Sequence, residues 1–397
     1  MRATRFALLI CTVAISILPA TGQAANVKCN SGQSLATAVA VAQPESTISF
    51  SGVCKGPINV NANGLTLDGQ NTGIIDGGSS NNAVIITGVH RFTLSHATIR
   101  NGISGIVVQA GGIATLSNLA VNSNSFDNIL ITGNSSATIA DTNLRGGVNG
   151  LDVESSSSVI FTGHVVSSDA LAFGIDIGTG SSVTLSGARV RVSGNALGIQ
   201  VGVGASGFID PASSLLAFNN ATTGITVVSG SHLVNFGGRM ETAGNKIDGF
   251  SADSKSGLDL DAASMLFAHD NGQDGVHLEE TSVLNMFNTT AFSGAPGNTT
   301  LISDKNAGQG IGVHGNSEFH MNNQVKLVSQ SNNGGGALAD NGSALIMINS
   351  NLIQNTGFDV ELTFGSRGDL SSSHIGVITC DATALIRGDA AATCPSR

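Results

Sequence analysis

Short runs in which apolar and polar residues alternate recur along the chain at a nearly constant interval. Each run opens on a small residue, and a turn residue, most often Asn, precedes that residue by four positions. Successive runs are 22 to 26 residues apart, with one interval of 35. Alternation predicts β-strands with one buried face, and eleven copies at one spacing predict a repeat architecture. The opening residues are Gly105, Asn128, Gly150, Gly174, Gly198, Gly224, Gly249, Gly275, Gly310, Gly336 and Asp359.

The length of the repeat favours one fold. A coil of three short strands and three turns takes about two dozen residues, whereas leucine-rich repeats of that length need Leu at fixed positions and a helix per unit. We therefore expect an all-β chain, folded as a single right-handed parallel β-helix of about a dozen coils. It would span residues 55–370, with short caps at 25–54 and 371–397. The recurring Asn suits left-handed turn positions, and stacked Asn side chains can form a hydrogen-bonded ladder.

The first 24 residues have the features of a cleavable signal peptide. Arg2 and Arg5 precede an apolar run at 6–18, and small residues stand at 22–24, before the expected cleavage site. The run is too short to cross a bilayer as a helix. We therefore expect export, with the mature protein secreted, periplasmic or at the cell surface.

Four cysteines remain in the expected mature chain, two near each end. An even count in an exported chain indicates disulfides, and the spacings are not those of a zinc site. Three pairings are possible. The local one, Cys29 with Cys54 and Cys380 with Cys394, needs the least rearrangement of the chain, and we expect it.

Charged residues are scarce, and acidic ones outnumber basic ones. They make up 11% of the chain, against about 25% in an average domain. The formal net charge is −10, and becomes −12 once Arg2 and Arg5 are removed. This balance argues against nucleic acid or an anionic membrane as a partner. After the first 24 residues, no segment has the length and apolarity of a membrane span.

The early coils carry a resemblance to a known group. Pro57-Ile-Asn-Val, Leu65-Thr-Leu-Asp-Gly and Phe92-Thr-Leu resemble the opening coils of the pectate lyase and polygalacturonase superfamily. The segment 27–69 is similar to the start of many exported bacterial right-handed β-helix proteins. The resemblance covers roughly residues 55–362 and implies the fold, together with a substrate groove along one outward face. The Asn-Thr-Asp, Gly-His-Gly and Arg-Ile-Lys signatures of polygalacturonases and the Asp-Pro-His of alginate epimerases are absent.

The alternation assigns side chains to two outward rows. In each run, the first and third residues after the opening one are mostly apolar and should point inward, so the second and fourth should face solvent. The second positions are Val107, Leu130, Asp152, Asp176, Gln200, Thr226, Ser251, His277, Gly312, Leu338 and Glu361. The fourth positions are Gln109, Thr132, Glu154, Gly178, Gly202, Val228, Asp253, Glu279, His314, Asp340 and Thr363.

Asp152, Glu154 and Asp176 form the first candidate catalytic group. Asp152 and Asp176 should lie one coil apart, about 5 Å, and Asp152 and Glu154 about 7 Å apart. Glycoside hydrolysis needs a protonated acid and a second carboxylate at such separations. Repulsion between like charges would raise the pKa of one of them. The alternative is a solvated polar face without activity.

A second group combines acids with two histidines on two or three adjacent coils. Its members are Asp248, Asp253, Asp270, Asp274, His277, Glu279 and His314. The longest coil, with a turn at 296–297, lies beside them, where it could wall a site. Asp274, His277, Glu279 and His314 are the candidate catalytic residues, with His277 as acid or base. Asp253 and Glu279 are candidate calcium ligands; we expect no other cofactor. The alternative is a charged exterior.

Two functions are compatible with these patterns. The first is a non-catalytic surface or envelope protein, in which the β-helix is a rigid or adhesive rod. The second is an enzyme or binding protein that uses an outward groove for a polysaccharide or cell-surface glycan. The outward rows hold no Lys or Arg, and the chain has no Trp or Tyr to stack on sugar rings. These features favour the rod.

Overall fold

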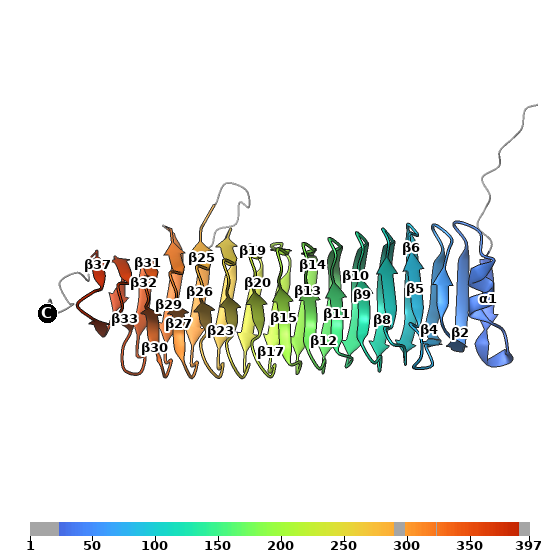
Figure 1. The fold of residues 1–397 in the computed structure, drawn as a ribbon, viewed down its shortest axis with the longest axis horizontal. Coiled ribbons are helices and arrows are strands. Elements are labelled where there is room, and N and C mark those ends of the chain that lie inside the picture. The colour runs from blue at the N-terminus through green and yellow to red at the C-terminus, as the bar shows by residue number, and fades with distance from the viewer. Residues whose placement is uncertain (1–23, 290–297, 323, 389–397) are drawn as a thin grey trace, which may run out of the picture.

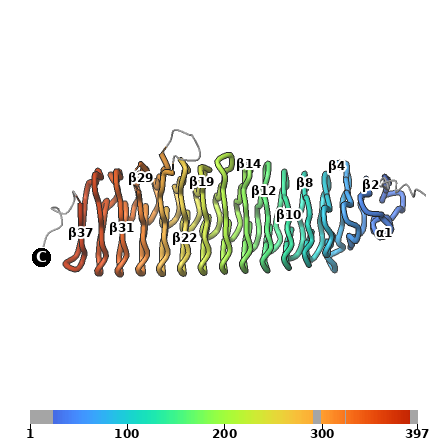
Figure 2. The backbone as a smooth tube through the Cα atoms, turned by 90° about the horizontal axis from the view of Figure 1, so that it is seen from above, coloured from blue at the N-terminus to red at the C-terminus, as the bar shows by residue number. Residues whose placement is uncertain are grey.

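The computed structural model describes residues 24–289, 298–322 and 324–388, which form one rod of stacked coils (Figure 1). Successive coils follow one another along the long axis, from α1 at the N-terminal end to β37 at the C-terminal end (Figures 1 and 2). In the described part of the chain the strands form two parallel sheets, of 23 and 14 strands. The prediction of an all-β parallel β-helix is confirmed.

The smaller sheet carries the two outward rows of side chains. Its strands are β3 (Ile58–Val60), β5 (Val84–Thr87), β7 (Ile106–Gln109), β9 (Asp127–Ile131), β11 (Asn149–Val153), β13 (Phe173–Ile177), β15 (Leu197–Val201), β18 (Ile225–Val227), β21 (Phe250–Ala252), β24 (Val276–Leu278), β27 (Gln309–Val313), β30 (Gly335–Ala339), β33 (Val360–Leu362) and β36 (Ile378–Cys380).

The larger sheet covers the rest of each coil. Its strands are β1 (Ala24–Lys28), β2 (Thr47–Lys55), β4 (Thr66–Asp76), β6 (Phe92–Arg100), β8 (Ile113–Asn122), β10 (Ser136–Arg145), β12 (Ser158–Ser168), β14 (Ser182–Ser193), β16 (Ser206–Ile209), β17 (Ser214–Phe218), β19 (His232–Phe236), β20 (Arg239–Ala243), β22 (Gly257–Asp261), β23 (Met265–His269), β25 (Val283–Met286), β26 (Thr299–Asp304), β28 (Glu318–Met321), β29 (Val325–Gln330), β31 (Ala344–Ile348), β32 (Ser350–Ile353), β34 (Arg367–Ser371), β35 (His374–Ile375) and β37 (Leu385–Arg387).

Each coil has three faces, because the larger sheet bends once per coil. β14 pairs with both β16 and β17, so one long strand spans two faces that separate strands form in the next coil. In the early coils the bend falls at Asp141 and Gly163, whose φ angles are 45° and 63°. The strand register shifts there, as expected where an extra residue turns a strand.

The interior is a single apolar column along the rod. Leu151 and Val153 are completely buried, while Asp152 between them is partly exposed, so the predicted alternation holds. Val107 departs from it: this second-position residue is only 3% exposed. Its neighbours in the row, Ile85 and Leu130, are also apolar, and they cover it from both sides.

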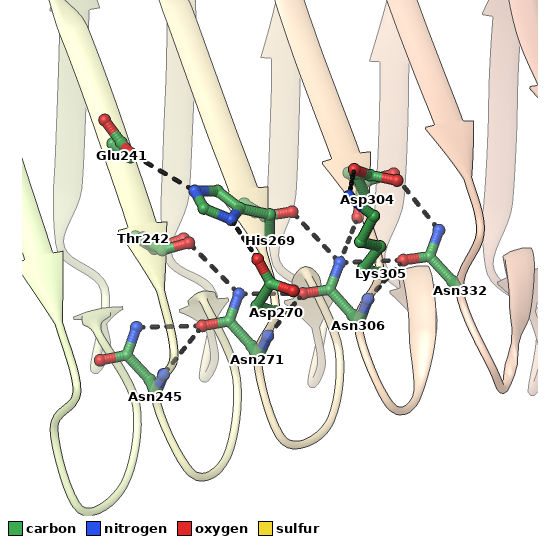
Figure 3. Close-up of polar contacts among 12 residues, drawn as sticks. Glu241, Thr242, Asn245, His269, Asp270, Asn271, Asp304, Lys305, Asn306 and Asn332 are labelled. Carbon is green, nitrogen blue, oxygen red and sulfur yellow. Dashed lines mark hydrogen bonds and ion pairs between the residues drawn. The ribbon is translucent and has the colours of Figure 1, made fainter.

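The predicted Asn ladder is present, and its members are buried except for Asn355, which is partly exposed. From Asn195 to Asn355, each side-chain amide donates to the Oδ1 atom of the Asn one coil further on, over 2.9 to 3.2 Å. Figure 3 shows its middle part. In the first of these coils the repeat predicted the turn residue at Gly194. The ladder member is instead the next residue, Asn195. At the far end Asn355 donates to Asp359 Oδ1 at 2.8 Å. The seven members are Asn195, Asn220, Asn245, Asn271, Asn306, Asn332 and Asn355.

The N-terminal end is closed by α1 (Leu35–Ala40), which buries Leu35 and Val39. Ser34 caps this helix, because its hydroxyl oxygen accepts a hydrogen bond from the backbone N–H of Thr37 at 3.2 Å. η1 (Cys29–Ser31) precedes the helix. No helix in the described residues has the length and apolarity required to cross a membrane.

Strand pairing runs past both boundaries that we drew from the sequence. β1 and β2 already pair in parallel before residue 55, and β35, β36 and β37 continue the stack after residue 370. Both segments contain short alternating runs, but they lack the glycine-anchored motif by which we traced the repeat.

The Cys29–Cys54 disulfide is confirmed, and it ties the segment before α1 to β2. Cys394 lies outside the described residues, so its pairing with Cys380 stays a prediction. Residues 1–23 also lie outside them, and the signal peptide likewise stays a prediction.

Candidate functional site on the smaller sheet

A continuous polar row runs along the smaller sheet. Neighbouring members are register partners in adjacent strands, so each lies one coil from the next. The members are Asp152, Asp176, Gln200, Thr226, Ser251 and His277. Four coils separate Asp176 from His277, which is about 19 Å at the spacing of paired strands. Two clusters of titratable side chains occupy the ends of this row.

The acidic cluster consists of Asp127, Asp152, Glu154 and Asp176. Asp127 is completely buried. Its Oδ1 atom accepts a hydrogen bond from the Asn149 side chain at 3.0 Å, while its Oδ2 atom is buried without a hydrogen-bond partner among the described residues. Glu154 accepts a hydrogen bond from Thr132 at 3.1 Å. The structure thus brings the three predicted residues together and adds a fourth, buried acid.

Burial and mutual repulsion shift the acidic cluster towards its protonated state. Burial raises the pKa of Asp152 to about 7, and the charges of Asp127, Asp176 and Glu154 add to the increase. Burial also raises the pKa of Asp127 to about 6, against the opposing effect of its bond from Asn149. The pKa of Asp176 is raised by burial, although a hydrogen bond from Gln200 partly offsets the rise. The cluster therefore holds protons close to neutral pH.

The histidine cluster consists of Asp248, Asp274, His277, Glu279, His314 and Asp340. His277 lies between two carboxylates, with Nδ1 3.0 Å from Asp274 Oδ2 and Nε2 3.4 Å from Glu279 Oε2. The His314 ring stands one coil further on, with its centroid 5.0 Å from that of His277. Its Nδ1 atom lies 3.1 Å from Asp340 Oδ1. Both imidazoles are partly buried, with 24% and 20% of their side chains exposed.

Asp274 is fixed from two sides. Its backbone N–H donates to Asp248 Oδ1 at 3.0 Å, and its Oδ1 atom accepts the backbone N–H of Gln309 at 2.7 Å. Only 8% of its side chain is exposed. Gly312 is the register partner of His277 and places no side chain of its own between Asp274 and the His314 ring.

The histidine cluster combines a positively charged imidazole with neighbouring carboxylates. Burial opposes the charged form of His277, but the hydrogen bond to Asp274 and the charges of Asp248 and Asp274 outweigh it and raise the pKa to about 9. The pKa of Asp248 is raised to about 6, chiefly by burial. Near neutral pH, His277 therefore carries a positive charge within a group of carboxylates.

Two residues of the second predicted group do not join this cluster. Asp270 instead lies beside His269, with 2.7 Å between Oδ2 and Nδ1, just after β23 of the larger sheet. Asp253 accepts a hydrogen bond from Ser254 at 3.1 Å. Calcium binding by Asp253 and Glu279 stays a prediction. The extra residues of the long coil fall between β25 and β26 of the larger sheet, and 290–297, with the proposed turn, lie outside the described residues.

The sequence analysis missed the contributions of Asp127, Asp340 and Gly312. Asp127, Asp248 and Asp274 each directly precede the opening residue of a run. Extending the rows by this one position would have revealed Asp127 as a member of the acidic cluster. Asp340 and Gly312 already stood in the outward rows, but their importance depends on side-chain rotamers that a repeat pattern does not give.

The fold and its rows define a right-handed parallel β-helix protein. A family model described as "Right handed beta helix region" matches residues 82–247, and the resemblance drawn from the sequence is confirmed at the level of fold. A search of curated proteins finds no match.

Among solved structures, the chain is similar to three β-helix enzymes. A double mutant of the periplasmic alginate epimerase AlgG has 13% identity and a TM-score of 0.44, over 93% of this chain and 84% of that one. The Azotobacter vinelandii mannuronan C-5 epimerase AlgE6 A-module has 11% identity and a TM-score of 0.39, over 86% and 90%. Pectate lyase Pel9A has 12% identity and a TM-score of 0.34, over 91% and 80%.

Proposed function

We propose that the protein hydrolyses a polysaccharide, with the acidic cluster as its catalytic centre. The observation that carries this proposal is the state of Asp152. This residue is partly exposed in the outward row, yet burial and three neighbouring carboxylates raise its pKa to about 7. A carboxylic acid that keeps its proton near neutral pH is what glycoside cleavage needs as its acid.

Asp152 and Asp176 have complementary roles in this proposal. They are register partners in adjacent strands, whose backbones lie about 5 Å apart; a retaining glycosidase needs its two carboxyl groups roughly 5 to 5.5 Å apart, a separation that neighbouring side chains of one row can reach. Asp152 gives its proton to the glycosidic oxygen as the bond to the anomeric carbon breaks, and Asp176 attacks that carbon. Water then displaces Asp176 and returns a proton to Asp152. Asp127 acts as a positioning residue, because its charge keeps the proton on Asp152.

The surroundings of the cluster favour a neutral glycan. Between the two clusters the row offers Gln200, Thr226 and Ser251, whose amide and hydroxyl groups can pair with sugar hydroxyls. Lys and Arg, which an anionic polymer would call for, do not occur in the row. Phe126 is next to Asp127 in the chain and 50% exposed, so it offers an aromatic face for a sugar ring.

The test is hydrolysis of a polysaccharide panel by the purified protein, measured as new reducing ends. We expect cleavage of a neutral polymer. Asp152→Asn should lower the rate by about 100-fold or more, the usual contribution of a general acid. Asp259→Asn is the matched control, since Asp259 pairs with His232 on the larger sheet at 3.0 Å; its rate should equal that of the unchanged protein.

The competing function is the non-catalytic rod expected from the sequence. A panel that yields no product, or an Asp152→Asn variant as active as the control, would overturn the enzymatic proposal and leave the rod as the remaining prediction. Export, which both functions assume, stays a prediction and is tested by N-terminal sequencing of the mature protein.

A further inference from the structure

We propose that Asp274, His277 and His314 bind a divalent transition-metal ion, with Zn²⁺ the best fit. The potential ligand atoms of these three residues all lie within 4.8 Å of one another. This inference goes beyond the proposed function, because the site shares no residue with the acidic cluster and its test needs no glycan.

Each of the three ligands has one atom held by an outer partner and a second atom facing the others. For His277, Nε2 faces Glu279 at 3.4 Å while Nδ1 is directed at Asp274. For His314, Nδ1 is held by Asp340 at 3.1 Å, which leaves Nε2 on the inner side. Carboxylates that orient imidazole ligands in this way are the usual outer shell of a metal site.

The third ligand follows the same arrangement. The Oδ1 atom of Asp274 accepts the backbone N–H of Gln309 at 2.7 Å, and Oδ2 is the atom directed at His277. Because Asp274 is almost fully buried, its inner oxygen is positioned before any ion arrives. A metal would replace the direct contact between Asp274 Oδ2 and His277 Nδ1.

Gly312 leaves the space that an ion requires. A Cβ atom on this residue would lie 2.7 Å from Asp274 Oδ2 and 2.8 Å from His314 Nε2. Gly312 lies within β27 and its φ is not in the left-handed region, so the backbone does not demand glycine there. The missing side chain instead keeps open a position that is close to two of the three ligand atoms.

His269 on the larger sheet provides a contrast within the same molecule. It also lies between two carboxylates, 3.3 Å from Glu241 and 2.7 Å from Asp270 (Figure 3). However, its register partner one coil on is Asp304 rather than glycine. Lys305 lies 3.4 Å from Asp304 and supplies a positive charge at that point. His269 has the carboxylates but neither a second imidazole nor an open position.

The donor set selects the class of metal. Two imidazole nitrogens and one carboxylate oxygen suit Zn²⁺ and its neighbours in the first transition row, whereas Ca²⁺ requires six or more oxygen ligands. Three protein ligands leave the fourth position of a tetrahedral Zn²⁺ ion open. Water or a hydroxyl group of a bound molecule can occupy that position.

The experiment is calorimetric titration of the chelator-treated protein with Zn²⁺ and, separately, with Ca²⁺. We expect one equivalent of Zn²⁺ to bind, and a weaker response to Ca²⁺. His277→Gln and His314→Gln should each lower the affinity for Zn²⁺ by at least about 100-fold, more than the loss of an outer-shell partner. His269→Gln is the matched control and should bind as the unchanged protein does.

Co²⁺ provides a second readout that does not depend on stability. The unchanged protein and the His269→Gln variant should show the intense visible absorption of four-coordinate Co²⁺, and the His314→Gln variant should not. The proposal is overturned if Zn²⁺ affinity is the same in all three variants, if Ca²⁺ binds as tightly as Zn²⁺, or if His314→Gln keeps the Co²⁺ spectrum. None of these results bears on whether the acidic cluster cleaves a glycan.

Discussion

The acidic and histidine clusters lie on the same sheet, and they differ in how the negative charge of their buried carboxylates is compensated. Each contains a buried aspartate just before the opening residue of a run, Asp127 in one and Asp274 in the other. Around Asp127 every titratable neighbour is a carboxylate, and protons relieve the repulsion, so that the pKa of Asp152 rises to about 7. Beside Asp274 stands an imidazole, and the pKa of His277 rises to about 9.

The difference shows how a repeat fold acquires distinct sites without changing its backbone. Strand pairing, register and buried columns are the same at both clusters. What differs is a small number of outward residues, above all His277 and the glycine that follows it in the row.

Filling the gap at Gly312 should strongly weaken metal binding without removing a ligand. Gly312→Val places side-chain atoms between Asp274 and His314, and we expect Zn²⁺ affinity to fall by at least about 100-fold, which is about 2.7 kcal/mol. Calorimetric titration measures it. Gly178→Val is the control on the acidic side, where a Cβ atom meets nothing within 4 Å. Equal affinities in the two variants would contradict the role of the gap.

Replacing one titratable residue by its neutral analogue should affect the stability of the folded protein differently in the two clusters. In the metal-free protein at pH 8, His277→Gln leaves Asp248 and Asp274 without their cation and should lower the free energy of unfolding by about 2 kcal/mol. Asp152→Asn removes a repelling charge and should leave stability equal or higher. Denaturant unfolding of both variants measures this, and destabilisation by Asp152→Asn at that pH would refute the contrast.

The two clusters should lose stability with rising pH in different windows. A folded-state pKa raised above its unfolded value favours the folded state below that unfolded value, and the benefit is lost as pH rises through the folded pKa. For Asp152 this window runs from 3.8 to about 7, and for His277 from 6.5 to about 9.

Melting temperatures of the metal-free protein between pH 4 and 10 measure these windows. Asp152→Asn should flatten the lower window and His277→Gln the upper one, each by about 3 °C. If either variant left both windows unchanged, the corresponding assignment of the titrating group would be wrong.

An outer-shell change should have the smallest effect. Asp340→Asn retains an acceptor for His314 Nδ1 but removes its charge, and we expect Zn²⁺ affinity to fall by about 10-fold. Asp369→Asn on the larger sheet, whose carboxylate accepts a hydrogen bond from Ser371 at 2.7 Å, is the control. A loss as large as that of Gly312→Val would mean that Asp340 is itself a ligand.

The repeat interval was sufficient to predict the fold, because every coil must repeat the same strand and turn lengths to keep its neighbours in register. It also predicted the pairing of Asp152 with Asp176, which follows from register alone. It failed at the ends, where β2 and β37 continue the stack without the glycine-anchored motif. At both ends strand pairing continues, but the motif by which the repeat was recognised in the sequence is absent.

The candidate sites could be predicted only in part. The row assignments brought His277 and His314 together, because both lie on adjacent coils of one sheet. They could not separate Asp270 from this group, since Asp270 stands only four residues before Asp274 but lies beyond the turn, next to His269. Nor could they show that the space above Gly312 is open, which depends on how the rings of two other coils are rotated.

The Asn ladder gives the rod a direction. Each side-chain amide from Asn195 to Asn332 donates to the Asn of the next coil, so each interior member accepts one hydrogen bond from the coil before it and donates one to the coil after it. The last amide, that of Asn355, donates within its own coil to Asp359 Oδ1, and an aspartate side chain has no N–H group with which to extend the ladder. An aspartate therefore ends the ladder. Spontaneous deamidation of any interior Asn to Asp would end it in the middle of the rod.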